Sequence, residues 1–212
     1  MKLLTDGPVD GPPLLLAHGA GAPMDSDFLE SIARGLGEQG VRVVRFEFPY
    51  MRRRRAEGRR FPPDRQPVLL EAFREALASF PGPEGVVIGG KSMGGRMASL
   101  LATEVPVAGV VCFGYPAHPR GRPERTRLAH LPGLRAPMLI CQGERDPMGG
   151  RETLDAHDPG PAVQVRWFAD GDHDLRPRKR SGHDYSAHMK TAVDVTADFI
   201  HRLRNGRSVS GI

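Results

Sequence analysis

Six short runs rich in Val, Ile and Leu divide the chain at fairly regular intervals. Most of them lack the alternation of apolar and polar residues that marks a half-exposed strand. We therefore expect strands that are buried on both faces, as in a parallel sheet covered by helices. The runs are Pro13–His18, Val41–Phe48, Gly85–Gly89, Val107–Phe113, Pro137–Gln142 and Val163–Phe168.

Between these runs, apolar residues recur every three or four positions, which is the spacing of a helix that buries one side. Four helices are predicted in this way, around residues 28–36, 69–80, 93–101 and 189–203. The alternation of strands and helices favours an α/β fold with a doubly wound, mostly parallel six-stranded sheet flanked by helices. We expect a single domain over residues 1–212, in which residues 206–212 form a flexible tail.

The segment GVVIGGKSMGG, residues 85–95, fits two motifs with different functions. One is the phosphate-binding pattern G-x-x-x-x-G-K-S, which begins at Gly85. The other is the nucleophile-elbow pattern G-x-S-x-G, formed by Gly90, Ser92 and Gly94. A phosphate cradle needs an exposed, bendable loop after its first glycine, whereas the letters VVI at this place favour a strand. The elbow is therefore the preferred interpretation, with Ser92 at the sharp turn between strand and helix.

A serine nucleophile needs a base and an acid that orients the base, since a lone serine after a strand can equally be a helix cap. On a fold with this elbow, the chain order is serine, then acid, then histidine. Asp146 follows the run Pro137–Gln142, and His173 follows the run Val163–Phe168. Both fall where parallel sheets collect their functional residues, so Ser92, Asp146 and His173 are predicted to act together.

Other residues compete for these roles in the sequence. Glu144 and Asp172 are alternative acids in the same two loops, and His183 is the nearest alternative base. Stabilising a negative oxygen also needs backbone donors, for which Met93, directly after the serine, and Ala20, in the segment LLLAHGAGAPMDS, are the candidates.

These motifs together resemble the α/β-hydrolase superfamily. The closest resemblance is to a compact bacterial family related to dienelactone hydrolases and to the testis-expressed-30 and NSL-complex hydrolase-like domains. The segments that carry it are LLLAHGAGAPMDSDF, RFEFPYMRRRRAEGRRFPPDR, IGGKSMGGRMAS, FGYPAHPRGRPERTRLAHL, CQGERDPMG and GDHDLRPRKRSG.

The resemblance implies a minimal hydrolase fold whose usual first strands are missing or reduced to MKLLTD. It also implies a Ser92–Asp146–His173 triad. It names no substrate, and some eukaryotic relatives act as scaffolds.

The chain carries a net charge of +5, concentrated in the stretches MRRRRAEGRRFPPDR and LRPRKRSG. Both stretches follow predicted strand ends, so one hypothesis is that Arg59, Arg60 and Lys91 bind an anionic substrate. The alternative is that the arginines pair with local acids such as Glu57 and Asp64.

Nucleic acid is disfavoured as a partner. The basic stretches contain almost no aromatic residues for base stacking, and Trp167 is the only tryptophan. Cys112 and Cys141 lie in apolar runs without metal-ligand spacing, and no signal peptide or membrane span is recognisable. We therefore expect a cytoplasmic protein that needs no metal and no organic cofactor.

The sequence as a whole predicts a serine hydrolase of carboxylesterase type. It would cleave a small acyl ester or thioester through an acyl-enzyme, with a preference for anionic substrates. Amide hydrolysis and acyl transfer use the same intermediate and stay open. The alternative function is a weakly active scaffold, or a protein that binds polyanions through its arginines.

Overall fold

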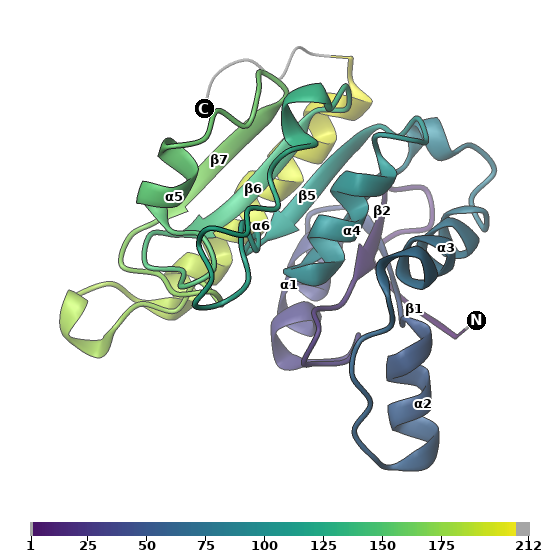
Figure 1. The fold of residues 1–212 in the computed structure, drawn as a ribbon. Coiled ribbons are helices and arrows are strands. Elements are labelled where there is room, and N and C mark those ends of the chain that lie inside the picture. The colour runs from purple at the N-terminus through teal and green to yellow at the C-terminus, as the bar shows by residue number, and fades with distance from the viewer. Residues whose placement is uncertain (1, 207–212) are drawn as a thin grey trace.

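A seven-stranded sheet runs through the protein, with helices on both of its faces (Figure 1). The computed structural model describes residues 2–206. Within this part of the chain, the sheet order is β1-β3-β2-β4-β5-β6-β7, and only β1 is antiparallel to its neighbour. The strands are β1 (Leu3–Asp6), β2 (Pro13–Ala17), β3 (Arg42–Phe46), β4 (Val87–Lys91), β5 (Gly109–Phe113), β6 (Met138–Gly143) and β7 (Val163–Phe168).

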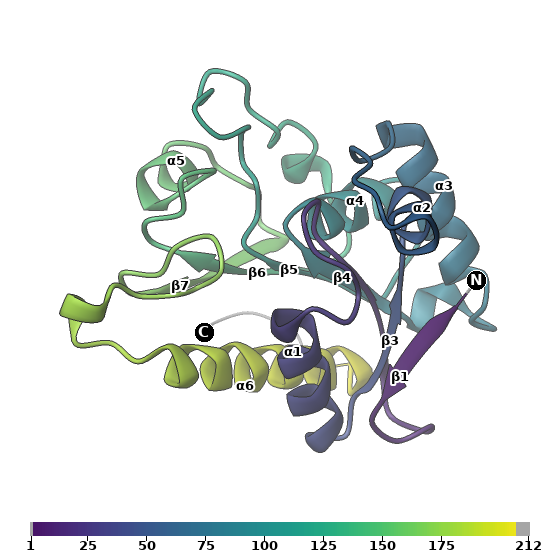
Figure 2. The same ribbon diagram turned by 90° about the horizontal axis from the view of Figure 1, so that it is seen from below.

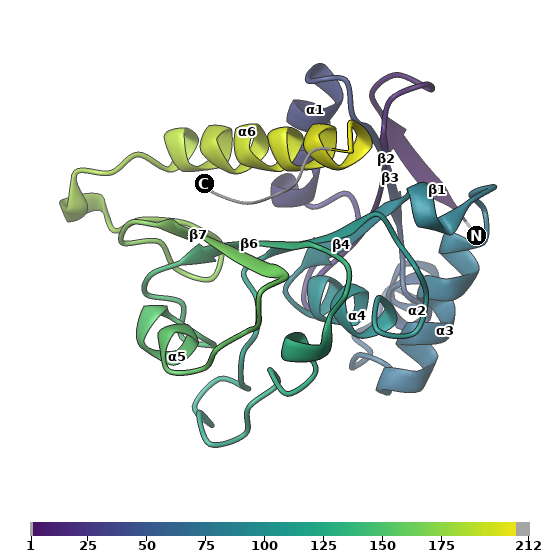
Figure 3. The same cartoon turned by 90° about the horizontal axis from the view of Figure 1, so that it is seen from above.

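The helices form two layers, one on each side of the sheet. Helices α1 and α6 cover one face, and α2, α3, α4 and α5 lie on the other (Figures 2 and 3). The helices are α1 (Asp27–Glu38), α2 (Pro49–Glu57), α3 (Gln66–Leu77), α4 (Met93–Leu101), α5 (Arg151–Asp155) and α6 (Tyr185–Arg204). This arrangement confirms the predicted doubly wound α/β class.

Burial on both faces explains the unbroken apolar runs in the sequence. In β2, Leu14 and Leu16 belong to the core under α1 and α6, while Leu15 and Ala17 belong to the core under α3 and α4. All four side chains are fully buried. Because both faces of the strand need apolar side chains, no alternation with polar residues remains.

The predicted number of strands was wrong by one. Leu3–Asp6, within the segment MKLLTD, forms the edge strand β1, which pairs antiparallel with β3. The six-strand prediction missed it because only four residues pair and their burial alternates between exposed and half-buried. An edge strand of this kind carries little apolar signal.

Two helices were not predicted from the apolar pattern. Helix α2 holds four consecutive arginines and has no apolar stripe; it begins with Pro49 and ends at Gly58, which adopts the left-handed conformation with φ 65°. Helix α5 has only five residues. Apolar periodicity cannot detect either of them, although proline at the start and glycine at the end are end signals for α2.

The tail predicted for residues 206–212 lies, apart from Gly206, outside the described residues. The last predicted helix, around residues 189–203, begins earlier in the structure than its apolar residues indicated, at Tyr185. Asp184 caps it by accepting a hydrogen bond from the backbone N–H of Ala187 (2.9 Å).

Helix α4 packs against the sheet at a glycine. A Cβ atom added to Gly95 would overlap Cys112 Sγ and lie 2.7 Å from Cys112 Cβ. We expect Gly95→Ala to lower the free energy of unfolding by about 1–3 kcal/mol, because the helix would have to move away from β5. Chemical denaturation measures this change.

Gly85→Ala is the matched control for this prediction. A Cβ added to Gly85 would lie in open space, with no atom of residues 2–206 within 4 Å, and the φ of Gly85 is not positive. We expect a change within about 0.5 kcal/mol. Equal destabilisation by the two substitutions would contradict the packing described for α4.

Candidate active site

Ser92 occupies the sharp turn between β4 and α4. Its backbone has φ 52° and ψ −114°, and it is one of three non-glycine residues with positive φ among residues 2–206. The backbone N–H of Ser92 donates to the carbonyl of Phe113 at the end of β5 (2.9 Å). Such strained conformations persist only where the surrounding structure enforces them, and they cluster at functional sites.

The turn is possible because Gly90 and Gly94, on either side of Ser92, have no Cβ atom. A Cβ on Gly90 would lie 2.5 Å from the carbonyl oxygen of Ala17, and one on Gly94 would lie 2.6 Å from the same oxygen. Residues Val87–Lys91 are strand and are buried, so they cannot form a loop around phosphates. The phosphate-cradle interpretation is therefore wrong, and the local geometry is that of a nucleophile elbow.

The loops after β6 and β7 bring an acid and a base together. His173 Nδ1 donates a hydrogen bond to Asp146 Oδ2 (2.7 Å). The Asp146 side chain is fully buried, whereas the imidazole is about one-fifth exposed. With the Nδ1 proton held by the carboxylate, Nε2 of the neutral ring is left as the acceptor, which is the form a general base requires.

Gln142, in β6, fixes the position of the Asp146 carboxylate. Its side-chain Nε2 donates to Asp146 Oδ2 (2.9 Å), to the carbonyl of Gly149 (2.7 Å) and to the carbonyl of Tyr115 (3.2 Å). Its Oε1 accepts from the Tyr115 N–H (2.6 Å). The backbone N–H of Met148 donates to the other carboxylate oxygen (2.8 Å). A buried carboxylate with this many donors is held in one orientation.

The alternative acids have other partners. Glu144 pairs with Arg151 (2.8 Å), whose hydrogen bond lowers the pKa of this carboxyl, and it also accepts from the Asp170 N–H (3.2 Å). Asp172 accepts from two backbone N–H groups within its own loop, those of Asp174 and Arg176. Within residues 2–206, neither carboxylate forms a hydrogen bond or an ion pair with the imidazole of His173.

The alternative base, His183, lies away from Ser92. Its ring packs against His188 with 5.8 Å between ring centroids, and it does not line the cavity that contains Ser92. Among the described residues, His173 is the histidine that shares a cavity with Ser92.

The loop after β2 is held by His18 and Tyr50. His18 Nε2 accepts from the Phe48 N–H (3.1 Å), so the neutral ring carries its proton on Nδ1, which donates to the carbonyl of Gly19 (2.7 Å). The Tyr50 hydroxyl lies 3.2 Å from the Gly19 carbonyl and 3.1 Å from the Ala20 carbonyl. Burial lowers the pKa of His18 and raises that of Tyr50, so both groups stay neutral.

These contacts hold the carbonyl groups of Gly19 and Ala20 toward His18 and Tyr50. Ala20 itself lines the cavity beside Ser92. Met93 is the first residue of α4, where backbone N–H groups lack partners within the helix. The predicted roles of Ala20 and Met93 as oxyanion donors stay a prediction.

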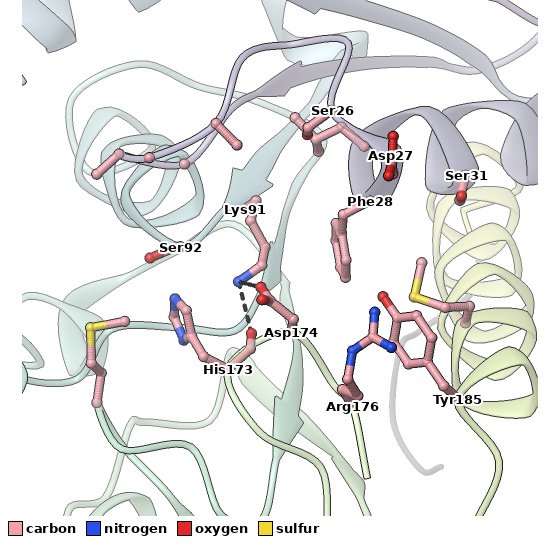
Figure 4. Close-up of a pocket in the computed structure, with 17 residues that line it drawn as sticks. Ser26, Asp27, Phe28, Ser31, Lys91, Ser92, His173, Asp174, Arg176 and Tyr185 are labelled. Carbon is pink, nitrogen blue, oxygen red and sulfur yellow. Dashed lines mark hydrogen bonds and ion pairs between the residues drawn. The ribbon is translucent and has the colours of Figure 1, made fainter. Parts of the chain in front are cut away.

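The Lys91 side chain reaches the His173 loop instead of solvent. Its Nζ donates to the carbonyl of His173 (2.7 Å) and pairs with Asp174 (3.1 Å), as the dashed lines in Figure 4 show. It also lies 5.5 Å from the centroid of the Phe28 ring. Lys91 was predicted to bind substrate, and it does line the cavity, but its charge is already engaged by the protein.

Arg59 and Arg60 follow α2 and are exposed. Arg59 pairs with Glu57 (2.8 Å) and lies over the ring of Phe61 (4.9 Å). Neither arginine is among the residues that line the cavity with Ser92. Their predicted substrate-binding role thus has no contact in this structure that supports it.

A cavity of about 850 Å³ opens at the carboxyl ends of β2 and β4. Figure 4 shows Ser92 and His173 at one end of it, and Arg176 and Tyr185 at the other, with Phe28 between them. Among residues 2–206, no hydrogen bond joins the Ser92 hydroxyl to His173. In ligand-free enzymes such bonds are often long and tighten when substrate binds.

No group of three or more His, Cys, Asp and Glu side chains within residues 2–206 is arranged to hold a metal ion. In the same part of the chain, no helix combines the length and the apolar character needed to cross a membrane.

A family model described as an alpha/beta hydrolase domain matches residues 10–201. The chain belongs to the α/β-hydrolase family. This agrees with the resemblance drawn from the motifs and supports a hydrolase. The match extends from the residues just before β2 to the last helix, so it includes every candidate site residue.

Solved structures share the fold of this α/β hydrolase at low sequence identity. A dienelactone hydrolase from Anabaena variabilis has a TM-score of 0.69 and 20% identity, covering 95% of this chain and 92% of its own. The esterase domain of a Rhodothermus marinus protein has a TM-score of 0.65 and 20% identity, covering 94% and 91%.

A third such structure is an alpha-beta serine hydrolase homologue from Coxiella burnetii. It has a TM-score of 0.65 and 18% identity, covering 96% of this chain and 90% of its own. At these identities, the similarities establish the fold.

Sequence reasoning missed three supporting residues of this α/β hydrolase: Gln142, Tyr50 and the orienting role of His18. His18 was visible as the end of a strand before a glycine-rich loop. Gln142 was visible only as a polar residue in an otherwise apolar run. A polar residue that is fully buried in a central strand needs partners, and that signal could have led to Asp146.

We expect His18 to stay neutral, with its proton on Nδ1, through the pH range in which an ordinary imidazole of pKa 6.5 becomes charged. Burial favours the neutral ring in the folded protein only. Its contribution to stability is therefore complete above pH 6.5 and is lost as the pH falls from there toward the folded pKa. Nitrogen-15 NMR of the imidazoles measures the tautomer and the titration. A His18 ring that titrates at or above pH 6.5 would contradict the hydrogen bonds described.

Proposed function

We propose that this chain is a serine hydrolase of carboxylesterase type that cleaves small acyl esters or thioesters through an acyl-enzyme on Ser92. The observation that carries the proposal is a serine in an enforced positive-φ turn that shares a cavity with an imidazole bound to a buried carboxylate. The strained backbone at the serine costs free energy, and such strain clusters at functional sites. A carboxylate that holds the imidazole in one tautomer is what a general base next to a nucleophile requires.

In the first half of the proposed reaction, Ser92 Oγ attacks the acyl carbonyl carbon. Nε2 of His173 takes the hydroxyl proton as the bond forms, and the imidazolium is stabilised by Asp146 through the 2.7 Å hydrogen bond. The backbone N–H groups of Met93 and Ala20 stabilise the negative oxygen of the tetrahedral intermediate. His173 then gives the proton to the leaving alcohol or thiol, and the acyl group remains on Ser92.

In the second half, water replaces the leaving group. Nε2 of His173 takes a proton from the water, the resulting hydroxide attacks the acyl-enzyme, and the acid is released as Ser92 regains its proton. Each proton transfer in this sequence uses the same nitrogen. The fixed Nδ1–carboxylate bond ensures that this nitrogen always faces the cavity.

The preference for anionic substrates that we expected from the arginines rests, within this proposal, on Arg176. Arg176 lines the far end of the cavity, and its guanidinium lies 4.0 Å from the centroid of the Tyr185 ring. Within residues 2–206, it forms no ion pair with a carboxylate. A guanidinium held on a ring and free of an acid partner is suited to binding a carboxylate or phosphate on the substrate.

We expect Ser92→Ala to abolish hydrolysis of 4-nitrophenyl acetate above the rate of the buffer and to abolish labelling by a fluorophosphonate probe. Asp146→Asn should lower kcat by on the order of 10³–10⁴-fold, because the amide favours the wrong tautomer of His173. Steady-state kinetics and gel-based labelling measure both effects.

Glu144→Gln is the matched control, since Glu144 is an acid in the same loop with a different partner. It should keep kcat within about threefold of the wild type. The proposal would be overturned by a Ser92→Ala variant with wild-type turnover, or by a loss in Glu144→Gln as large as that in Asp146→Asn.

A second prediction distinguishes Arg176, which lines the cavity, from Arg59 and Arg60, which do not. On 4-nitrophenyl hemiesters of succinate, glutarate and adipate, Arg176→Gln should lower kcat/KM by about 10-fold for at least one chain length. Loss of a charge-assisted hydrogen bond has this magnitude. On the uncharged ester of matched length, its effect should be below about twofold. Kinetics on the paired substrates measure the ratio.

The double variant Arg59→Gln/Arg60→Gln is the control, because these residues lie outside the cavity. It should leave the ratio between charged and uncharged substrates unchanged. If Arg176→Gln reduced both substrates equally, the proposed recognition of an anion at this end of the cavity would fail.

A further inference from the structure

We propose that Lys91 is a positioning residue that sets the imidazole of His173 relative to Ser92. This inference rests on the proposed hydrolase function. Lys91 is the last residue of β4 and precedes Ser92 directly in the chain. Its ammonium donates to the carbonyl oxygen of His173 (2.7 Å), so one side chain connects the strand that carries the nucleophile to the residue that carries the base.

The loop that carries His173 is strained on both sides of the imidazole. Asp170 has φ 54° and Leu175 has φ 62°, and neither residue is glycine. Each such conformation is disfavoured for residues with a side chain. A loop with two of them adopts a single shape only if contacts outside it hold both of its halves.

The two halves are held by different contacts. On the first half, the Asp170 carboxylate pairs with Arg145 (2.8 Å) and with Arg178. On the second half, Lys91 binds the His173 carbonyl and the Asp174 carboxylate (3.1 Å), and His188 Nδ1, in α6, lies 2.8 Å from the carbonyl oxygen of Leu175. Among these anchors, Lys91 alone comes from the strand that leads into Ser92. Its loss would let His173 move with respect to the nucleophile while the first half stayed in place.

The ammonium sits in a tight cage. A Cβ added to Gly114 would lie 3.0 Å from Lys91 Nζ and 2.5 Å from the carbonyl oxygen of His173. Gly114 has φ 68°, and the ring of Phe28 closes another side with its centroid 5.5 Å from Nζ. The Lys91 side chain is 9% exposed. This space fits a compact ammonium and excludes the larger, planar guanidinium of arginine.

The bond to the carbonyl matters more than the ion pair. The Asp174 side chain is 61% exposed, and ion pairs with exposed partners contribute little. A buried ammonium bonded to a carbonyl is a charge-assisted hydrogen bond in a region of low dielectric constant, which is stronger and more directional. Replacing the lysine and replacing the aspartate should therefore have different effects.

The test compares Lys91→Met with Asp174→Asn and the wild type, using 4-nitrophenyl acetate as substrate. We expect Lys91→Met to lower kcat by about 10- to 100-fold with KM changed by less than about threefold, since a misplacement of about 1 Å has this cost. The rate of fluorophosphonate labelling should fall by the same factor. Asp174→Asn, which keeps the bond to the carbonyl, should stay within about threefold of the wild-type kcat.

Two further measurements separate positioning from general destabilisation. Ile200→Val removes a buried methyl group near the end of α6, away from the cavity lining, and should lower the melting temperature without lowering kcat. In Lys91→Ala, added propylammonium should restore at least part of kcat by donating to the same carbonyl, whereas tetramethylammonium, a cation without an N–H group, should not. If Lys91→Met does not fold, Lys91→Gln, which keeps a polar end in the cage, takes its place.

The inference is overturned if Lys91→Met keeps the wild-type kcat, or if only KM rises, which would make Lys91 a substrate-binding residue. It is also overturned if propylammonium and tetramethylammonium act alike. Failure of the proposed function has a different signature. In that case, wild type and Ser92→Ala would not differ in turnover or labelling, whatever the lysine variants do.

Discussion

One backbone bend determines how the candidate active site of this protein is built. Ser92 adopts a conformation that is costly for any residue with a side chain, and it is held there from two directions. Gly90 and Gly94 let β2, β4 and α4 approach one another closely, and Phe113 binds the Ser92 N–H from the neighbouring strand. The hydroxyl is consequently presented at the edge of the sheet, where the cavity begins. Asp146, His173 and the loop after β2 all lie around this fixed point.

Residues at the ends of strands hold the polar groups around the bend, which explains how side chains on loops are placed accurately. The two hydrogens of the Gln142 side-chain NH2 are shared among three acceptors and its oxygen accepts one hydrogen bond, all within reach of the carboxyl ends of β5 and β6. Such a satisfied network is stable when buried, because no polar group is left without a partner. It also removes freedom from Asp146. Glu144, two residues earlier, is directed to Arg151, so the loop offers only one carboxylate to His173.

Sequence reasoning was strongest where a single strong signal decides the structure. The apolar runs located six strands because burial on both faces leaves a continuous signal, and the motif around Ser92 identified the elbow because three strand-forming residues precede it. The directions of side chains in the candidate site depend instead on contacts with distant parts of the chain. The direction of the Lys91 side chain depends on Phe28, Gly114 and Asp174, which lie far apart in the sequence. No local pattern distinguishes a lysine that faces substrate from one that holds a loop.

The arginines show why a basic stretch does not by itself locate a binding site. Helix α2 has no apolar stripe, so it needs other contacts to stay in place. Tyr50 and Met51 supply them by packing into the core, and the arginines of α2 with Arg59 add ion pairs. The pairs are Arg53–Asp64, Arg55–Glu47, Arg55–Asp25 and Arg59–Glu57. Arg53, Arg55 and Arg59 therefore have acid partners within the chain, which weakens the field that they present to a ligand. Arg176 lies against the Tyr185 ring, lines the cavity and forms no ion pair among the described residues, so its position makes it the candidate for binding an anion.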